Sequence, residues 1–203
     1  MRPERSYTSR PVYLLGILGL SLALVAGVAI AGTDNAPYGI LGQPAPELNL
    51  GNWIDGDGNQ REILRLENLR GKVVYLYFFQ AWCPGCQSHG FPTLKALTEK
   101  FDSNPDVAFV AVQTVFEGHF VNTPDKLRAS QIKYGIRVPM AHDAGGSVSG
   151  RIPETMRSYR SGGTPWTVII DPDGTVVYNQ FHIQVEQATA LIQKLLERSL
   201  NPS

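Results

Sequence analysis

The sequence contains only two cysteines among 203 residues, Cys83 and Cys86, separated by Pro84 and Gly85. Two cysteines cannot form the set of several disulfides that staples many small secreted domains. A zinc site would need two further ligands, and there is no second cysteine pair to supply them. A structural Cys83–Cys86 disulfide would close a four-residue ring and contribute only about 2 kcal/mol on the chain-entropy relation. The pair therefore indicates a redox-active dithiol better than a cross-link or a metal site.

The chain also lacks an excess of charge of either sign, because 18 Lys and Arg balance 18 Asp and Glu. A nucleic-acid-binding domain carries a concentrated basic surface, so this balance argues against a nucleic-acid partner. The sequence has no internal repeat, no low-complexity tract and no acidic tail. Beyond an apolar N-terminal stretch, its length suits one domain with a sizeable core.

One stretch lacks charge altogether, since no charged residue occurs between Arg10 and Asp34. Its apolar core, residues 12–31, is 20 residues long, which is enough to span a bilayer as a helix. Arginines precede it, so the N-terminus is predicted to lie in the cytoplasm and the remainder outside. We favour a retained single-pass anchor in the lipid bilayer; the alternative is a signal peptide cleaved after Ala29-Ile30-Ala31, leaving a secreted or periplasmic protein. Both interpretations export the domain, and they divide the chain into anchor or signal peptide (1–32), linker (33–41) and folded domain (42–203).

The two cysteines follow an apolar run, residues 75–79, that is too short and too aromatic for a helix and predicts a buried strand. Pro84 suits the first helical position, because its φ is fixed and the N–H that it lacks would have no partner there. We therefore expect Cys83 just before a helix and Cys86 one turn inside it. Unpaired N–H groups and the positive end of the helix dipole would lower the pKa of Cys83. Cys83 is then the attacking thiolate, and Cys86 resolves the mixed disulfide.

The rest of the chain alternates between strand and helix patterns. Asp55-Gly56-Asp57-Gly58 predicts a turn between short strands, and its acids lack the spacing of a calcium-binding EF-hand loop. The order of elements predicts an α/β fold with a central mixed sheet and helices on both faces. In chain order we expect a strand at 73–79, a helix at 87–101 that Pro92 kinks or interrupts, a strand at 107–112, a helix at 123–134, a strand at 138–141, a helix at 152–159, a hairpin of strands at 166–170 and 175–181, and an amphipathic helix at 185–200.

With these elements placed, the sequence resembles the thioredoxin-like superfamily, and more closely its membrane-anchored TlpA/ResA-type thiol–disulfide oxidoreductases. The resemblance covers residues 41–200 and implies a thioredoxin-like fold with an N-terminal β extension and an insertion before a cis-proline. It rests on Gly42 with Pro44-Ala45-Pro46, Asp57-Gly58, Leu69-Arg70-Gly71-Lys72-Val73-Val74, Trp82-Cys83-Pro84-Gly85-Cys86, Phe91-Pro92, Thr164-Pro165 and Asp171-Pro172-Asp173-Gly174.

The resemblance also implies roles for residues outside the cysteine pair. Pro165 matches the cis-proline opposite the active disulfide, and Thr164 would offer its backbone to an extended substrate as an added strand. Trp82 would shield the nucleophile and contact partners, with simple packing as the alternative. Pro84 lies beside the nucleophile at the predicted substrate-binding surface, and with Gly85 it tunes the redox potential. No bound cofactor is implied.

The sequence departs from the family at three places. Tyr77 stands where thioredoxins have a buried aspartate, and an un-ionised phenol is a poor proton acceptor near pH 7. His89 replaces a glutamate of the ResA type. On an α-helix His89 would share a face with Cys86, so we hypothesise that it accepts the proton of Cys86 or of a leaving thiol; a surface or packing histidine is the alternative. The Phe91-Pro92 pair falls one residue late, which blurs the alignment of His89.

The sequence therefore predicts an exported enzyme that exchanges disulfides with disulfide-containing or dithiol protein substrates. The resemblance favours a reductant, in a process such as cytochrome c maturation, recharged by a membrane-embedded electron donor. A peroxiredoxin-like thiol peroxidase is one alternative, although Gln80 and Leu76 stand where that family has threonine and proline. A non-enzymatic thiol- or metal-binding module is the other. The remaining histidines, His119, His142 and His182, are predicted to be loop or surface residues.

Overall fold

The computed structural model of the chain describes residues 38–145 and 152–200. The predicted anchor or signal peptide, and residues 33–37 of the predicted linker, lie outside these ranges. Across the described residues, the structure has no helix that is both long enough and apolar enough to cross a membrane.

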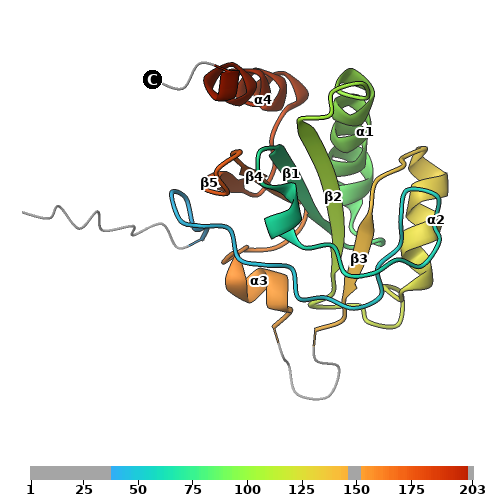
Figure 1. Cartoon of the computed structure of the whole chain (residues 1–203). Helices are drawn as coiled ribbons and strands as arrows, with labels where there is room; N and C mark the ends of the chain where they lie inside the picture. The colour runs from blue at the N-terminus through green and yellow to red at the C-terminus, as the bar shows by residue number, and fades with distance from the viewer. Residues whose placement is uncertain (1–37, 146–151, 201–203) are drawn as a thin grey trace, which may run out of the picture. The chain divides into compact units, whose positions relative to one another are not determined.

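A five-stranded mixed sheet, in the order β3-β2-β1-β4-β5, organises the described residues (Figure 1). Strand β1 is parallel to β2 and antiparallel to β4, so it occupies the centre of the sheet. In chain order the elements are a 3₁₀ helix Leu66–Leu69, β1 Val73–Phe79, a π-helical turn Cys86–Gly90, α1 Phe91–Lys100, β2 Val107–Thr114, α2 Asp125–Tyr134, β3 Met140–Asp143, α3 Glu154–Ser158, β4 Trp166–Ile170, β5 Val176–Gln180 and α4 Val185–Leu200.

All seven residues of β1 are buried, as its continuous apolar run predicted. Alternate side chains of a strand point to opposite faces of the sheet. β1 therefore contributes to two separate apolar clusters. Val73, Tyr75, Tyr77 and Phe79 belong to one cluster, and Val74, Leu76 and Phe78 belong to the other.

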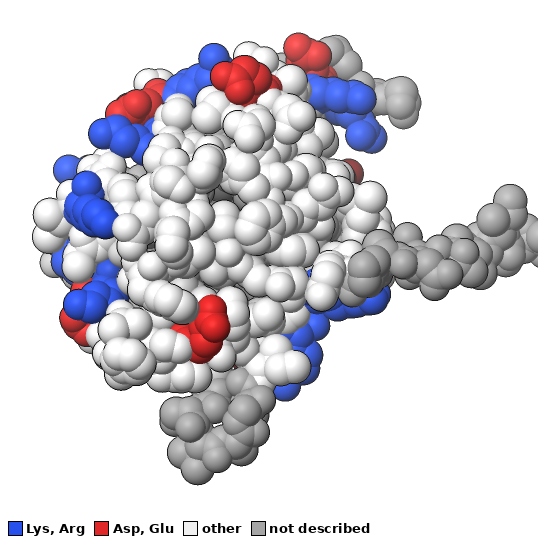
Figure 2. All heavy atoms as spheres, turned by 180° about the vertical axis from the view of Figure 1, so that it is seen from behind, with Lys and Arg blue, Asp and Glu red and all other residues white. Residues whose placement is uncertain are grey.

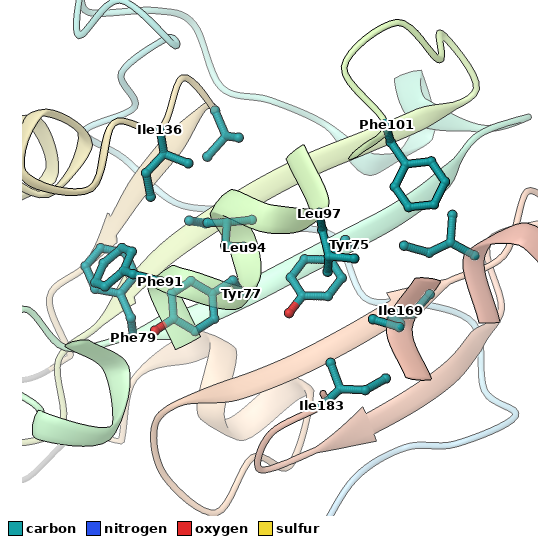
Figure 3. Packing of buried hydrophobic residues seen from close by; sticks show 14 of the residues in the cluster. Tyr75, Tyr77, Phe79, Phe91, Leu94, Leu97, Phe101, Ile136, Ile169 and Ile183 are labelled. Carbon is teal, nitrogen blue, oxygen red and sulfur yellow. The ribbon is translucent and has the colours of Figure 1, made fainter. Parts of the chain in front are cut away.

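The first cluster lies between the sheet and helices α1 and α4, which cover the same face (Figures 1 and 3). Helix α4 has the predicted bounds, and its predicted apolar face packs here. Of that face, Ala188, Ile192 and Leu195 are buried, and Leu191 and Leu196 are partly buried against the cluster.

The opposite face is covered by the segment that precedes β1, together with Tyr159 at the end of α3. The predicted N-terminal β extension appears as isolated bridges, which pair Pro44 with Thr175 and Ile54 with Gln60 and Met140. Prolines cannot donate to a strand ladder, so the Pro-rich start of this segment does not extend into regular strands. Apolar side chains still anchor it, namely Ile40, Leu48, Leu50, Trp53, Leu64 and Leu66.

Local turn chemistry is as predicted, whereas one strand is displaced. The Asp55 carboxylate accepts the backbone N–H groups of Asp57 and Asn59 at 2.8 and 2.9 Å, which closes the predicted turn. Strand β3 begins at Met140, two residues later than predicted. Pro139 immediately precedes it, and a residue without an N–H cannot join the ladder as a donor.

Charged side chains of both signs are interspersed around the face shown in Figure 2, while uncharged residues occupy its centre. This distribution accords with the equal numbers of acidic and basic residues in the sequence. Surface pairs such as Lys95 with Glu99, 3.7 Å apart, contribute little to stability because water screens them.

Candidate active site

The two cysteines lie where the sequence predicted them, at the carboxyl end of β1. The helix begins at Pro84, so Cys83 lies just outside it and Cys86 lies in its first turn. Residues Cys86–Gly90 form a π-helical turn that continues directly into α1. In this turn the Phe91 N–H donates to the Cys86 carbonyl. The next residue, Pro92, has no backbone N–H and cannot donate a hydrogen bond. The predicted interruption near Pro92 therefore takes the form of a wider helical turn.

Cys83 is partly exposed and strongly acidified. Its Sγ accepts the Cys86 backbone N–H at 3.4 Å and lies 3.5 Å from the Thr164 carbonyl oxygen. The pKa of Cys83 is lowered to about 5, and the largest cause is a side-chain hydrogen bond from Cys86. The backbone N–H groups of Cys86 and Gly85, and Thr164, lower it as well, whereas burial acts in the opposite direction. At neutral pH Cys83 is therefore a thiolate that substrates can reach.

Cys86 has the opposite properties. It is fully buried, and desolvation raises its pKa far above the ordinary value for a thiol. The hydrogen bond to Cys83 and the negative charge of that sulfur raise it further, while the Gln80 backbone and Thr164 act in the other direction. Both thiols are free in this structure. The pair thus consists of one reactive thiolate and one protected thiol that keeps its proton.

The peptide bond between Thr164 and Pro165 is cis, as predicted. Pro165 packs against the cysteine motif, because a Cβ placed on Gly85 would lie 3.1 Å from Pro165 Cδ. The segment before β4 therefore lies directly against the turn that carries Cys83.

Trp82 and Pro84 both lie at the surface on either side of Cys83. The Trp82 side chain keeps 46% of its area exposed. Its indole Nε1 lies close to Gly118, where an added Cβ would be 3.2 Å away, and Gly118 has a positive φ of 59°. Trp82 therefore both packs on the loop after β2 and exposes apolar surface beside the nucleophile.

A buried amide, which the sequence analysis missed, ties that loop to the turn before Cys83. Asn122 is 1% exposed, and its Oδ1 accepts the Ala81 N–H at 2.7 Å. Its Nδ2 donates to the Gly118 carbonyl at 3.1 Å and to Gln80 Oε1 at 3.4 Å. The only sequence signal was the position of this loop after a strand next to the motif. Asn122 itself looks like an ordinary loop residue.

The structure does not bring His89 to the cysteines. His89 is exposed, its Nδ1 lies 2.7 Å from Ser88 Oγ, and its ring contacts that of His182 at 5.8 Å between centroids. In the described residues, neither a hydrogen bond nor a ring contact joins it to Cys83 or Cys86. A π-helical turn has more residues per turn than an α-helix, so positions three apart no longer share a face.

The prediction that His142 is a loop or surface residue was wrong. It lies on β3, is 8% exposed, and its Nδ1 is 3.0 Å from Gln113 Oε1. β3 has the predicted length but is displaced by two residues, so it ends at Asp143 rather than at residue 141 and includes His142. His119 Nε2 is buried with no hydrogen-bond partner in the part of the chain that the structure describes. Over the same residues, no three His, Cys, Asp or Glu side chains gather as they would around a metal.

A cleft of about 740 Å³ lies at the opposite end of the sheet, where β2 begins. Ile63, Phe101 and Val107 are among its lining residues, and neither cysteine borders it. Val107 pairs with Val73 at the start of β1, whereas the cysteines follow the end of that strand. The cysteine pair therefore lies outside this cleft, beyond the carboxyl end of β1.

Comparisons with known proteins agree with this geometry. The profile of the AhpC/TSA family matches residues 41–179. The chain is 29% identical over 140 residues to the thiol–disulfide oxidoreductase ResA of Bacillus thuringiensis, covering 68% of this chain and 67% of that protein. It is 27% identical over 156 residues to ResA of Bacillus cereus, covering 76% and 78%. Among solved structures, a thiol–disulfide isomerase from Corynebacterium glutamicum is 35% identical with a TM-score of 0.64, covering 75% of this chain and 96% of that one. The chain therefore belongs to the AhpC/TSA family, as a thioredoxin-like thiol–disulfide oxidoreductase.

Proposed function

We propose that this enzyme is exported and reduces disulfides in protein substrates through Cys83 and Cys86. The observation that carries the proposal is the opposite acidity of the two thiols. Cys83 is an accessible thiolate, whereas Cys86 keeps its proton and is buried one turn behind it. A dithiol arranged in this way attacks with one sulfur and resolves with the other.

The reaction proceeds in two exchanges. The Cys83 thiolate attacks one sulfur of the substrate disulfide, which forms a mixed disulfide and releases the other substrate sulfur as a thiolate. Cys86 then loses its proton and attacks Cys83 Sγ. This step forms the Cys83–Cys86 disulfide and releases the second substrate thiolate. Substrate gains two electrons, the enzyme loses two, and the departing thiolates take up protons.

The substrate chain binds in an extended form beside Thr164. The Thr164 carbonyl oxygen lies 3.5 Å from Cys83 Sγ, and Thr164 comes just before β4. A substrate strand added at this point would therefore bring its sulfur to the nucleophile. Trp82 and Pro84 then supply exposed surface around the mixed disulfide. This arrangement supports the predicted roles of all four residues, including Pro165, which packs against Gly85.

The direction and the partners rest on the sequence and the relatives. The resemblance in sequence to the TlpA/ResA type favours a reductant, and each turnover then needs a fresh supply of electrons, for which we propose a membrane-embedded electron donor. Export rests on the apolar stretch at residues 12–31. The finer assignment, a role in cytochrome c maturation, is proposed on the same similarity.

Trapping with Cys86→Ser tests the proposal. Cys83 should retain its protein substrates as mixed disulfides that a reductant releases and mass spectrometry identifies. Cys83→Ser is the matched control, because its remaining thiol is buried and protonated and should capture nothing. Recovery of Cys83 carrying only small thiols, with no protein partner, would refute a protein substrate.

The thiol peroxidase alternative is not favoured. Gln80, which stands where peroxiredoxins have threonine, is 1% exposed and is held by the amide of Asn122. It therefore offers no hydroxyl to a peroxide at the nucleophile. Turnover of hydrogen peroxide by the purified chain, at a rate comparable with its disulfide reduction, would reverse this conclusion.

A further inference from the structure

Tyr77 is a buried tyrosine that the reaction described above does not use. It lies on β1 with no exposed surface, on the face that packs against α1 (Figure 3). Its ring stacks on Phe79 at 5.7 Å between centroids and meets Phe91 edge-on at 5.3 Å. Its hydroxyl donates to the Cys86 carbonyl oxygen at 3.3 Å. A polar atom from the strand thus reaches the residue that must resolve the mixed disulfide.

The π-helical turn makes room for this hydroxyl. A Cβ added at Gly90 would lie 2.1 Å from the Tyr77 oxygen, so position 90 accepts no side chain while the phenol is in place. The Cys86 carbonyl already accepts the Phe91 N–H across the same turn. The carbonyl therefore does not depend on Tyr77 for its hydrogen bond, and the phenol proton can be redirected without leaving a buried acceptor unpaired.

The electrostatics define what the phenol can do. Burial raises the pKa of Tyr77 well above its ordinary value, and the charge of Cys86 and a side-chain hydrogen bond to it raise the pKa further, as do Tyr75 and Cys83. Tyr77 therefore keeps its proton at every pH at which the enzyme works. Besides burial, the largest influences on the pKa of Cys86 come from Cys83, Thr164 and the Gln80 backbone, none of which is a carboxylate.

This inference rests on the proposed function. The geometry points to Tyr77 as the hydrogen-bond donor that stabilises the Cys86 thiolate while Cys83 is held in the mixed disulfide. The hydroxyl meets the Cys86 carbonyl at 3.3 Å, and a side-chain hydrogen bond with Cys86 also acts on it, so rotation of the phenol O–H would turn its proton from the carbonyl toward the sulfur of the same residue. No proton passes through Tyr77. Cys86 gives up its proton as it attacks Cys83 Sγ, and the departing substrate thiolate takes one up.

The role differs from that of a carboxylate at the same position. A carboxylate would accept the proton of the resolving thiol, whereas a phenol lowers the cost of the thiolate once it forms. A hydrogen bond to a charged group shifts an equilibrium by roughly 10- to 100-fold. Resolution should therefore depend on Tyr77, while the first attack by Cys83 should not.

A two-phase assay separates these steps. The reduced full-length chain is mixed with the aromatic disulfide DTNB, and release of nitrothiobenzoate is followed in time. Cys83 releases the first equivalent, and Cys86 releases the second when it resolves the mixed disulfide. We compare the wild type with Tyr77→Phe across pH. The matched control is Tyr75→Phe, which removes an equally buried phenol from the same face of β1 that bonds Thr167 instead.

For Tyr77→Phe we expect an unchanged first phase and a second phase slowed roughly 10- to 100-fold, with its pH profile moved to higher pH. Tyr75→Phe should change neither phase. A second phase of wild-type rate and pH profile in Tyr77→Phe overturns the inference, whereas loss of the first phase in the wild type refutes the proposed function instead. If Tyr77→Phe does not fold, Gly90→Ala replaces it. Its Cβ would lie 2.1 Å from the phenol oxygen and 2.5 and 2.6 Å from two ring carbons, so it displaces the whole phenol, and it must show the same slow second phase with an unchanged first phase.

Discussion

The acidity of Cys83 can be tested by removing its strongest support. A side-chain hydrogen bond from Cys86 is the largest cause that lowers the pKa of Cys83 to about 5, from an ordinary value of 9.0. Cys86→Ala deletes this donor, and Cys86→Ser keeps one in the form of a hydroxyl. Each variant leaves a single cysteine, so any thiol reactivity belongs to Cys83.

The magnitude follows from the strength of the lost bond. A hydrogen bond to a charged group contributes roughly 1.5 to 3 kcal/mol, and one pKa unit corresponds to about 1.4 kcal/mol. Cys86→Ala should therefore raise the pKa of Cys83 by roughly one to two units. The lower end is expected, because Cys83 is partly exposed and water replaces part of the lost donor. Cys86→Ser should stay close to the wild type.

The assay is the rate of alkylation by iodoacetamide as a function of pH, since only the thiolate reacts. In the wild type, mass spectrometry of the modified peptide restricts the measurement to Cys83. A wild-type midpoint close to the ordinary 9.0 would refute the assigned acidity. A Cys86→Ala midpoint equal to that of the wild type would instead show that the backbone N–H groups, rather than the Cys86 side chain, acidify the nucleophile.

Three further outcomes are expected. His89→Gln should leave the pH profile of disulfide reduction unchanged, because His89 is exposed and bonded to its neighbours rather than to a thiol; a displaced profile would restore it as the proton acceptor. Burial lowers the pKa of His142 below 6.5, so its neutral form stabilises the fold above that pH and the stabilisation is lost as pH falls. In denaturant titrations of the oxidised protein, the wild type should lose more stability between about pH 7 and about pH 5 than His142→Gln. Asn122→Ala leaves the Ala81 N–H without its partner and should cost about 1 to 3 kcal/mol in the free energy of unfolding, whereas the exposed Asn68→Ala should change it by less than about 0.5 kcal/mol.

Local signals explain why much of the fold was predictable. Pro84 marked the helix start, Asp171-Pro172-Asp173-Gly174 marked the turn between β4 and β5, and the apolar spacing of residues 185–200 gave both ends of α4. Each of these signals acts over a few residues, through backbone geometry or helical periodicity. The resemblance supplied what local signals could not, namely the cis bond before Pro165.

The parts that sequence could not predict are set by contacts between distant residues. At the π-helical turn, Gly90 lies against a phenol from β1 that is 13 positions away in the chain. Helical periodicity assumes a constant number of residues per turn, so it placed His89 beside Cys86 when the wider turn separates them. Asn122 bonds Ala81 across 41 positions, and nothing in its own neighbourhood marks it as buried.

The contact between Tyr77 and Cys86 also bears on how the resolving thiol loses its proton. A buried carboxylate beside Cys86 would have to ionise in an apolar setting before it could accept a proton, which burial disfavours. Tyr77 avoids that cost because it stays neutral, but it cannot remove the proton of Cys86. The rate of resolution should then follow the thiolate fraction of Cys86, falling about tenfold for each unit of pH below its pKa. Because burial raises that pKa, the mixed disulfide should be long-lived in the wild type and longer-lived in acid. The test is to add substrate to the wild type at about pH 6 and at about pH 8, quench with acid, and measure the amount of mixed disulfide recovered. More should be recovered at about pH 6. Equal amounts at the two pH values would mean that a proton acceptor other than solvent serves Cys86.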